Sequence, residues 1–76
     1  MFFAQIELIV KLVKRLRELR EERTLSQTAV ANAIGFSTKA ISQYETGARE
    51  PSIETIKALC TFFGVSSDYL LGLKDE

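Results

Sequence analysis

The sequence predicts an all-α fold with five helices in one compact domain. Apolar residues recur at three- and four-residue spacings over nearly the whole chain, which is typical of amphipathic helices. No segment alternates with a period of two, and no Asn-Gly or Asp-Gly pair suggests a β-hairpin. A chain of 76 residues suits a single domain, near the lower size limit for a self-sufficient core.

The first helix is expected to run from near Phe3 to Arg23. A helix of that length extends about 31 Å, at roughly 1.5 Å per residue. The apolar residues that we expect along one face of this helix are Ile6, Ile9, Val10, Val13 and Leu16.

Two shorter helices follow, and each is preceded by a serine that can cap its first turn. Ser26 precedes the second helix, and Gly35 is expected to end it in the left-handed conformation. Ser37 precedes the third helix, which is expected to end near Thr46 and Gly47. The buried edge of the second helix is predicted at Val30, Ala31 and Ile34.

The last two helices repeat the same pattern of a serine before and a glycine after. Pro51 and Ser52 precede the fourth helix, and Gly64 ends it. Ser66 caps the fifth helix, in which Tyr69 and Leu70 are expected to pack before Gly72 ends it. The inner face of the fourth helix is predicted to consist of Ile53, Ile56, Leu59, Cys60 and Phe63.

The composition argues against catalysis. The chain has no histidine and one cysteine, so metal sites and catalytic triads that need histidine or several cysteines are excluded. Cys60 is expected to be a buried, inert thiol, and the carboxylates are scattered without a paired site. We therefore expect no enzyme activity, no cofactor and no metal.

The apolar N-terminal stretch "FFAQIELIVKLV" does not predict a membrane span. Gln5, Glu7 and Lys11 interrupt it, and it lacks the basic start and cleavage site of a secretory signal. A soluble, cytoplasmic protein is expected. The net charge is zero, but six basic and four acidic side chains fall within residues 1–26, so a neutral total is compatible with a basic face.

The connection "GFS" at residues 35–37 is so short that the second and third helices must meet at a steep angle. The small side chain of Ala31 allows the close approach, and Ile41 and Tyr44 anchor the third helix to the core. The opposite face of that helix is then polar and points outward, and it carries Thr38, Lys39, Ser42 and Gln43.

This polar face has the chemistry to read DNA in the major groove. Glutamine can pair with adenine, lysine can donate to guanine, and serine or threonine can serve either role. The first turn of the second helix, at Ser26 and Gln27, offers free N–H groups to a phosphate. The alternative is an ordinary solvated helix face without a ligand.

Several motifs in residues 15–73 together resemble the phage repressor and Cro-like helix-turn-helix family, also called the XRE family. They are "LSQ" at the second helix, "A-x-x-x-G" before the corner, "ISQYETG" in the third helix, "REPS" after it and "GVSSDYLLG" near the end. The resemblance implies a compact five-helix lambda-repressor-like DNA-binding domain with an extended first helix. It also implies a transcriptional regulator, usually a repressor, that binds operator DNA as a dimer.

The resemblance assigns roles to individual residues. It implies base reading by Thr38, Lys39 and Gln43, with Ser42 at the margin of the groove. An ion pair between Arg20 and Glu45 would join the first helix to the third, the alternative for Glu45 being a solvated charge. The positions implied to contact phosphate are Gln27, Ser37, Thr46 and Arg49, in addition to Ser26.

Two departures from the family pattern stand out. Glu50 occupies a loop position that is often basic in relatives, which predicts modest affinity for the DNA backbone. Residues 1–14 extend the first helix beyond the usual domain start; we therefore divide the chain into this extension, the domain at 15–73 and a tail at 74–76.

The extension is expected to leave apolar side chains exposed, because the domain can cover only the later half of the first helix. We expect them to mediate homodimerisation; the side chains concerned are Phe2, Phe3, Ile6, Ile9 and Val10. The alternatives are that the extension folds back on the last helix or is disordered. A second possible function is a protein-interaction module, such as an antitoxin or anti-repressor, that uses this apolar helix.

Overall fold

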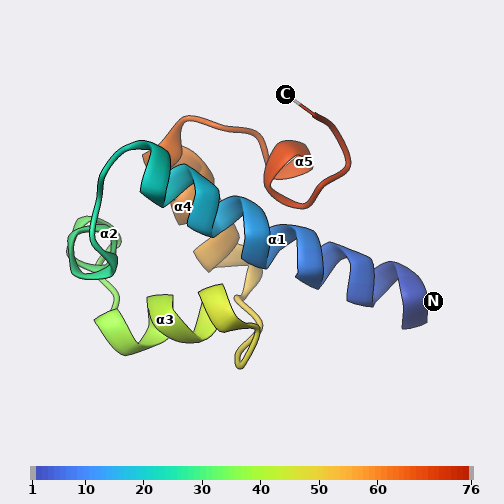
Figure 1. The fold of residues 1–76 in the computed structure, drawn as a ribbon, viewed down its shortest axis with the longest axis horizontal. Coiled ribbons are helices and arrows are strands. Elements are labelled where there is room, and N and C mark those ends of the chain that lie inside the picture. The colour runs from blue at the N-terminus through green and yellow to red at the C-terminus, as the bar shows by residue number, and fades with distance from the viewer. Residues whose placement is uncertain (1, 76) are drawn as a thin grey trace.

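The computed structural model describes residues 2–75 of the chain, with side chains from Glu7 onward, and contains five helices and no strand over that range. They are α1 (Phe2–Glu22), α2 (Gln27–Ile34), α3 (Thr38–Thr46), α4 (Ile53–Phe63) and α5 (Ser67–Leu70). In Figure 1, α3 and α5 lie on opposite sides of α1, which crosses the molecule, and both contact it. The second helix contacts α3 and α4, and α4 also contacts α5. The predicted all-α fold of five helices is confirmed.

Local capping explains where the helices begin. The side-chain oxygen of each of the four predicted caps accepts a hydrogen bond from a backbone N–H three residues later, at Ser26, Ser37, Ser52 and Ser66. The helix ends follow a second local rule, because α2, α3 and α4 are each followed by a glycine with positive φ. The fifth helix differs, since right-handed Leu71 follows it and Gly72 comes one residue later.

The core lies between the C-terminal half of α1 and the four shorter helices. Leu16, Ile41 and Leu59 have no exposed surface, and α1, α3 and α4 each contribute to one buried apolar cluster. The other fully or nearly fully buried apolar residues are Leu12, Leu19, Val30, Ala31, Ala40, Tyr44, Phe63 and Leu70.

The predicted inner stripe of α1 is wrong in part. Val10 is 57% exposed, whereas Leu12 is 3% exposed and Leu19 is 5% exposed. Two apolar stripes with helical spacing share Leu16, and packing against α3 and α5 selects the stripe that contains Leu12 and Leu19. Ile9 and Val13 are half-buried at its edge. The side chain of Ile6 lies outside the described residues.

The inner face predicted for α4 also needs a correction at its first residue. Ile53 is 78% exposed, while Leu59 and Phe63 are buried and Ile56 and Cys60 are half-buried. Thr55 turns inward instead and is 3% exposed, and its hydroxyl lies 3.0 Å from the hydroxyl of the cap residue Ser52. The capping turn therefore directs a polar side chain inward and leaves the isoleucine in solvent.

Coverage of α1 by the domain extends about one turn further toward its N-terminus than expected. Leu8 and Ile9 are half-buried and line a small apolar cavity with Pro51, Ile56 and Leu71, among others.

The tail after α5 crosses the same part of α1. The Arg15 guanidinium donates to the backbone carbonyls of Tyr69 and Lys74, and a Cβ at Gly72 would lie only 2.5 Å from the side chain of Lys11.

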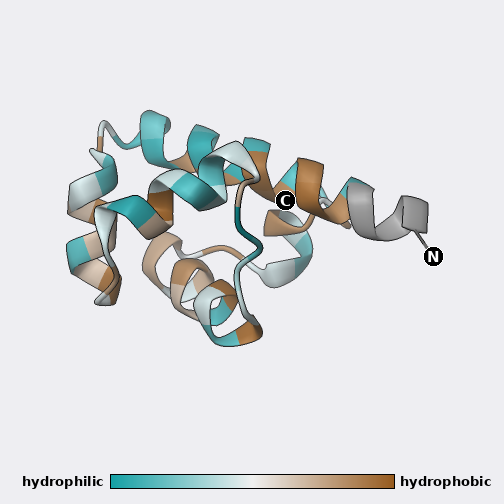
Figure 2. Ribbon diagram, turned by 90° about the horizontal axis from the view of Figure 1, so that it is seen from below, coloured by the Kyte–Doolittle hydropathy of each residue, from teal (hydrophilic) through white to brown (hydrophobic). Residues whose placement is uncertain are grey.

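The N-terminal turns of α1 extend beyond the other helices (Figure 1). Figure 2 shows that the character of α1 changes along its length, from mostly hydrophilic residues near its C-terminal end to hydrophobic bands next to the grey N-terminal turns. The side chains of Phe2 and Phe3, which the sequence placed in an apolar surface, lie outside the described residues.

Candidate nucleic-acid interface

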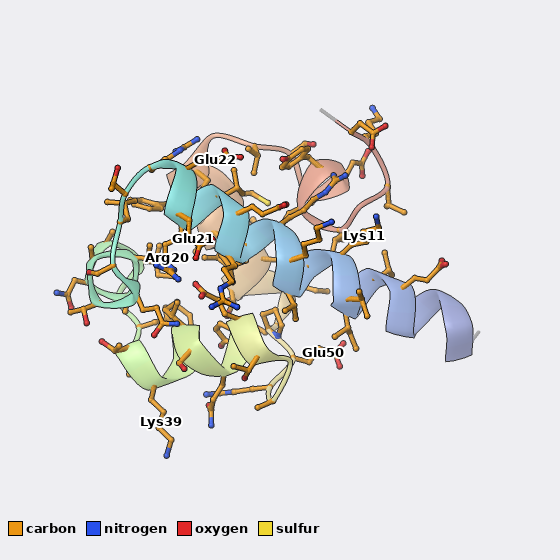
Figure 3. All side chains as sticks on the ribbon, viewed as in Figure 1. Lys11, Arg20, Glu21, Glu22, Lys39 and Glu50 are labelled. Carbon is orange, nitrogen blue, oxygen red and sulfur yellow. The ribbon has the colours of Figure 1, made fainter. Side chains whose placement is uncertain are left out.

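The outer side of α3 is the candidate recognition surface. Thr38 and Lys39, at the start of the helix, are exposed, and the ammonium group of Lys39 points away from the rest of the molecule (Figure 3). Ser42 and Gln43, one turn later, are half-buried, so neighbouring parts of the protein cover them more than they cover Thr38 and Lys39. No carboxylate interrupts this face between residues 38 and 44, which leaves it free of groups that repel phosphate.

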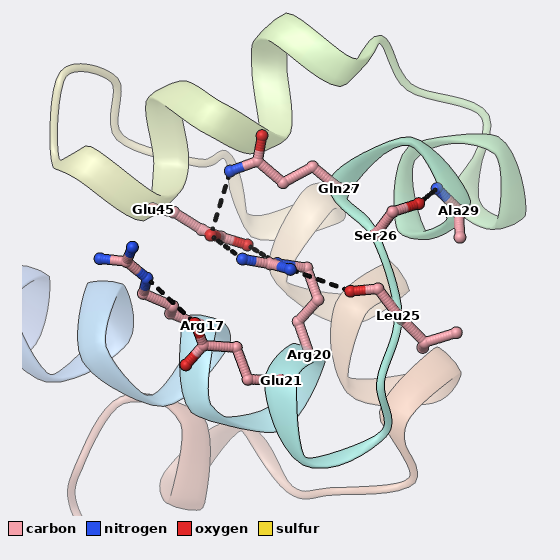
Figure 4. Close-up of polar contacts among 8 residues, drawn as sticks. All are labelled: Arg17, Arg20, Glu21, Leu25, Ser26, Gln27, Ala29 and Glu45. Atoms are coloured by element: carbon pink, nitrogen blue, oxygen red, sulfur yellow. Dashed lines mark hydrogen bonds and ion pairs between the residues drawn. The ribbon is translucent and has the colours of Figure 1, made fainter.

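The inner side of α3 is held by a buried polar cluster. Arg20 Nε lies 2.6 Å from Glu45 Oε2, and Arg20 Nη2 lies 3.0 Å from Glu45 Oε1, so the ion pair is bidentate (Figure 4). Gln27 Nε2 also donates to Glu45 Oε1 at 3.2 Å, and Arg20 donates to the carbonyl of Leu25. Glu45 is 5% exposed, and the hydrogen bonds that its carboxylate accepts from the guanidinium raise the pKa of Arg20 above its ordinary value.

This cluster joins three helices. Arg20 belongs to α1, Gln27 begins α2 and Glu45 lies in the last turn of α3. Bidentate arginine–carboxylate pairs are directional. The cluster therefore defines both the angle and the distance between α1 and the α2–α3 pair. No described side-chain nitrogen or oxygen is buried without a hydrogen-bond partner, which indicates that this packing satisfies its polar groups.

The predicted phosphate contacts surround α3 at its two ends. Ser26 and Ser37 are exposed, and each accepts a backbone N–H through its hydroxyl oxygen, so the hydroxyl proton stays available to a phosphate. Arg49 is exposed, and its guanidinium carbon lies 5.8 Å from the centre of the Tyr44 ring. Thr46 is less available, because its hydroxyl donates to the carbonyl of Gln43 at 3.3 Å.

The charges around the candidate surface are mixed. Lys39 and Arg49 are the basic side chains on α3 and in the loop after it, and Glu50 follows Arg49 directly. Glu50 lies at the opposite end of α3 from Lys39 and beside α1 (Figure 3), where it lines the same cavity as Leu8.

Thr28, which no sequence motif indicates, also lies on the candidate surface. The hydroxyl of Thr38 donates to the hydroxyl of Thr28, on α2, at 3.1 Å. Both side chains are exposed, and the hydrogen bond bridges the first turns of α2 and α3 across the corner. A threonine on the outside of a helix has no pattern in the sequence that would distinguish it from other solvated residues.

Other kinds of site find no support in the described residues. Among the side chains that the structure describes, from Glu7 to Asp75, no group of three or more metal-ligating residues comes together. The thiol of Cys60 is half-buried, and desolvation raises its pKa, which favours the unreactive protonated form. None of the described helices is both long and apolar enough to cross a bilayer.

The helices α2 and α3 form a short pair joined by a tight turn, and a buried ion pair anchors them to α1. The polar outer face belongs to α3, and this arrangement is that of a helix-turn-helix domain. The family model described as "Helix-turn-helix" matches residues 16–70. The chain belongs to this family, in its XRE branch, and the resemblance drawn from its motifs is confirmed.

The chain is similar to bacterial and phage regulators. It is 43% identical over 51 residues to the cryptic phage CTXphi transcriptional repressor RstR of Vibrio cholerae, a match that covers 67% of this chain and 46% of the relative. It is 37% identical over 67 residues to the HTH-type transcriptional regulator ImmR of Bacillus subtilis (strain 168), covering 88% of this chain and 52% of the relative. The chain thus spans about half the length of these curated relatives.

A solved structure supports the fold. The chain resembles the P22 c2 repressor protein, crystallised in complex with the synthetic operator 9T in the presence of Tl⁺, with a TM-score of 0.74 and 36% sequence identity. The match covers 78% of this chain and 89% of that chain. The lambda-repressor-like architecture expected from the sequence is therefore confirmed.

Proposed function

We propose that the protein is a sequence-specific DNA-binding transcriptional regulator that represses promoters by occupying operator DNA. The observation that carries this proposal is the likeness to a repressor described in complex with its operator, together with an exposed polar face on α3. The named relatives, a transcriptional repressor and a transcriptional regulator, support the same function.

The base-reading surface is the outer side of α3, which enters the major groove. Lys39 points away from the protein (Figure 3) and suits guanine, whose O6 and N7 are acceptors. Gln43 suits adenine, to which an amide can bond through both its donor and its acceptor. Thr38, the first residue of α3, reads a further base, and the half-buried Ser42 lies at the margin of the groove.

The phosphates on either side of the groove are contacted by the first turns of α2 and α3 and by the loop after α3. Ser26 and Ser37 bring hydroxyl donors next to the first backbone N–H groups of α2 and α3. Gln27 can offer a phosphate only the amide hydrogen that it does not donate to Glu45. Arg49 brings a full charge, and the neighbouring Glu50 reduces its effect. A Thr46 contact requires its hydroxyl to leave the carbonyl of Gln43.

Selection of bound sites from random duplex DNA tests this function. The purified protein should enrich one motif whose two halves are related by a two-fold axis, and its affinity for that motif should fall steeply with salt. Absence of any enriched motif would contradict the proposal. Co-purification of a stoichiometric protein partner, with no retained DNA, would instead favour the alternative of an interaction module.

We further propose that the protein binds its operator as a homodimer, through the projecting N-terminal half of α1. Val10 is 57% exposed there, on the same helix as the half-buried Ile9. Exposed apolar groups on such a stretch are covered efficiently by a second copy. The apolar residues Phe2, Phe3 and Ile6 continue the stretch in the sequence.

The dimer can be tested without disturbing the core. Deletion of residues 1–12 would remove buried Leu12, so a single substitution, Val10→Glu, is the sharper experiment. The mass in solution, measured by light scattering at several concentrations, should fall from that of a dimer to that of a monomer. Ile53→Glu is a matched control, because Ile53 is also an exposed apolar residue but lies on α4. A dimer that survives Val10→Glu would place the interface elsewhere.

A further inference from the structure

We propose that Thr28 sets the hydrogen-bonding polarity of Thr38, so that Thr38 acts only as an acceptor toward the base it reads. In this arrangement Thr38 selects a base that presents an amino donor in the major groove, which is adenine or cytosine. The inference rests on the proposed function, because it assigns a preference to one position of the DNA-reading surface.

The observation behind it is the hydroxyl–hydroxyl contact between the two helices. Thr38 Oγ1 lies 3.1 Å from Thr28 Oγ1, and both side chains are exposed on the outer side of the corner. Each hydroxyl has one proton to donate and two lone pairs that can accept. In a hydrogen bond between them, only one of the two protons can be used, and the other stays free.

The surroundings decide which proton stays free when DNA is bound. Thr28 belongs to the first turn of α2, next to Gln27 and close to the backbone N–H groups proposed to hold a phosphate. Phosphate oxygens only accept hydrogen bonds, so a Thr28 hydroxyl that reaches one must donate to it. Thr28 can then only accept from Thr38, which is the direction of the bond in the structure.

The consequence for Thr38 follows from the one proton and two lone pairs of its hydroxyl. With its proton given to Thr28, Thr38 presents only lone pairs to the groove. The donors available there are the N6 amino group of adenine and the N4 amino group of cytosine, whereas O6 and N7 of guanine and O4 of thymine are acceptors. Facing a guanine or thymine acceptor would set lone pairs against lone pairs.

The test uses Thr28→Val, which keeps the shape of the side chain and removes the hydroxyl, and Thr28→Ser, which keeps the hydroxyl. Affinities are measured for the selected operator and for its variants with all four bases at the position where Thr38→Val changes the preference. Thr28→Val frees the Thr38 proton, so the preference for adenine or cytosine over guanine or thymine at that position should fall about two- to tenfold, the range of one neutral hydrogen bond. Thr28→Ser should keep the preference.

One control variant and two further measurements separate this role from a structural one. Thr61→Val is the matched control, because Thr61 is an exposed threonine on α4 that lines a pocket with Ala33 and Phe62; it should change nothing. The slope of affinity against salt should be the same for Thr28→Val and for the unmodified protein, since no charge is altered. Combining Thr28→Val with Thr38→Val should reduce the preference no further than Thr38→Val alone.

The outcomes distinguish the inference from the function. If the Thr28→Val protein keeps the same base preference at that position, or loses affinity equally for the operators with each of the four bases there, the inference is wrong and the function stands. If the unmodified protein selects no DNA sequence, both are wrong. A loss of preference confined to that one position supports both.

Discussion

The two sides of α3 differ in what satisfies their polar groups. On the inner side, Glu45 is 5% exposed and receives hydrogen bonds from two other helices. On the outer side, Thr38 and Lys39 are exposed, and the only described partner of the Thr38 hydroxyl is another exposed hydroxyl. A helix of nine residues is thus rigidly positioned by one side and left open to a ligand by the other.

A small domain can position a recognition helix by giving its two sides separate tasks. The apolar contacts of Ile41 and Tyr44 supply non-directional attraction, while the bidentate pair supplies an orientation. Because the inner side carries the orientation, the outer side can vary in sequence without moving the helix. Substitutions on the two sides should therefore separate stability from binding.

Breaking the inner side should have the largest effect. Glu45→Ala removes the carboxylate and leaves Arg20, whose side chain is 14% exposed, without its partner. Loss of one member of a buried pair costs about 3–5 kcal/mol, and we expect the lower end because Arg20 keeps some contact with water. Urea unfolding followed by circular dichroism measures the change in the free energy of unfolding.

The exposed pair between Arg17 and Glu21 provides the control for that experiment. Both side chains are more than half exposed, at 62% and 58%, and their closest N–O distance is 3.6 Å. Glu21→Ala should change the free energy of unfolding by less than about 0.5 kcal/mol. A Glu45→Ala protein as stable as Glu21→Ala would show that the buried pair does not hold α3.

Changing the outer side should leave stability intact and alter sequence preference. Lys39→Ala and Gln43→Ala should each reduce discrimination at one base pair by about 1–3 kcal/mol if the contact is bidentate. Their unfolding free energies should stay within about 0.5 kcal/mol of the unmodified protein. Affinities for the selected operator and its single-base variants, measured by fluorescence anisotropy, check this.

Arg49→Ala distinguishes base reading from backbone attraction. It should reduce the affinity for all DNA sequences alike, because it removes a phosphate contact and no base contact. The slope of log affinity against log salt concentration should become shallower by about one. If Gln43→Ala instead reduced the affinity for cognate and scrambled DNA by equal factors, Gln43 would not be a base reader.

The corner between α2 and α3 should show a smaller effect. Gly35 has a φ of +77°, and nothing lies within 4 Å of the place where a Cβ would stand. Gly35→Ala therefore changes only the backbone energy and should cost about 1–2 kcal/mol of unfolding free energy. Gly35→Asn should cost less, since asparagine tolerates the left-handed conformation. Equal stability of all three proteins would show that the corner does not depend on glycine.

Much of the fold could be predicted because helix boundaries are local. A serine hydroxyl reaches a backbone N–H three residues away, and a glycine adopts positive φ without steric cost, so both signals can be read from neighbouring letters. The candidate surface was predictable for the same reason, since Ile41 and Tyr44 indicate which side of a nine-residue helix faces inward.

The number of helices, their caps and the family could all be read from the amino-acid sequence, because they depend on contacts within a few residues or on contiguous motifs. Packing between helices was needed to bury Leu12 rather than Val10, and to turn Thr55 inward while Ile53 stays in solvent. Helical spacing defines stripes but does not choose between overlapping ones. Contacts such as those of Thr28 with Thr38 depend on the angle at which two helices cross, and that angle results from packing of the whole core.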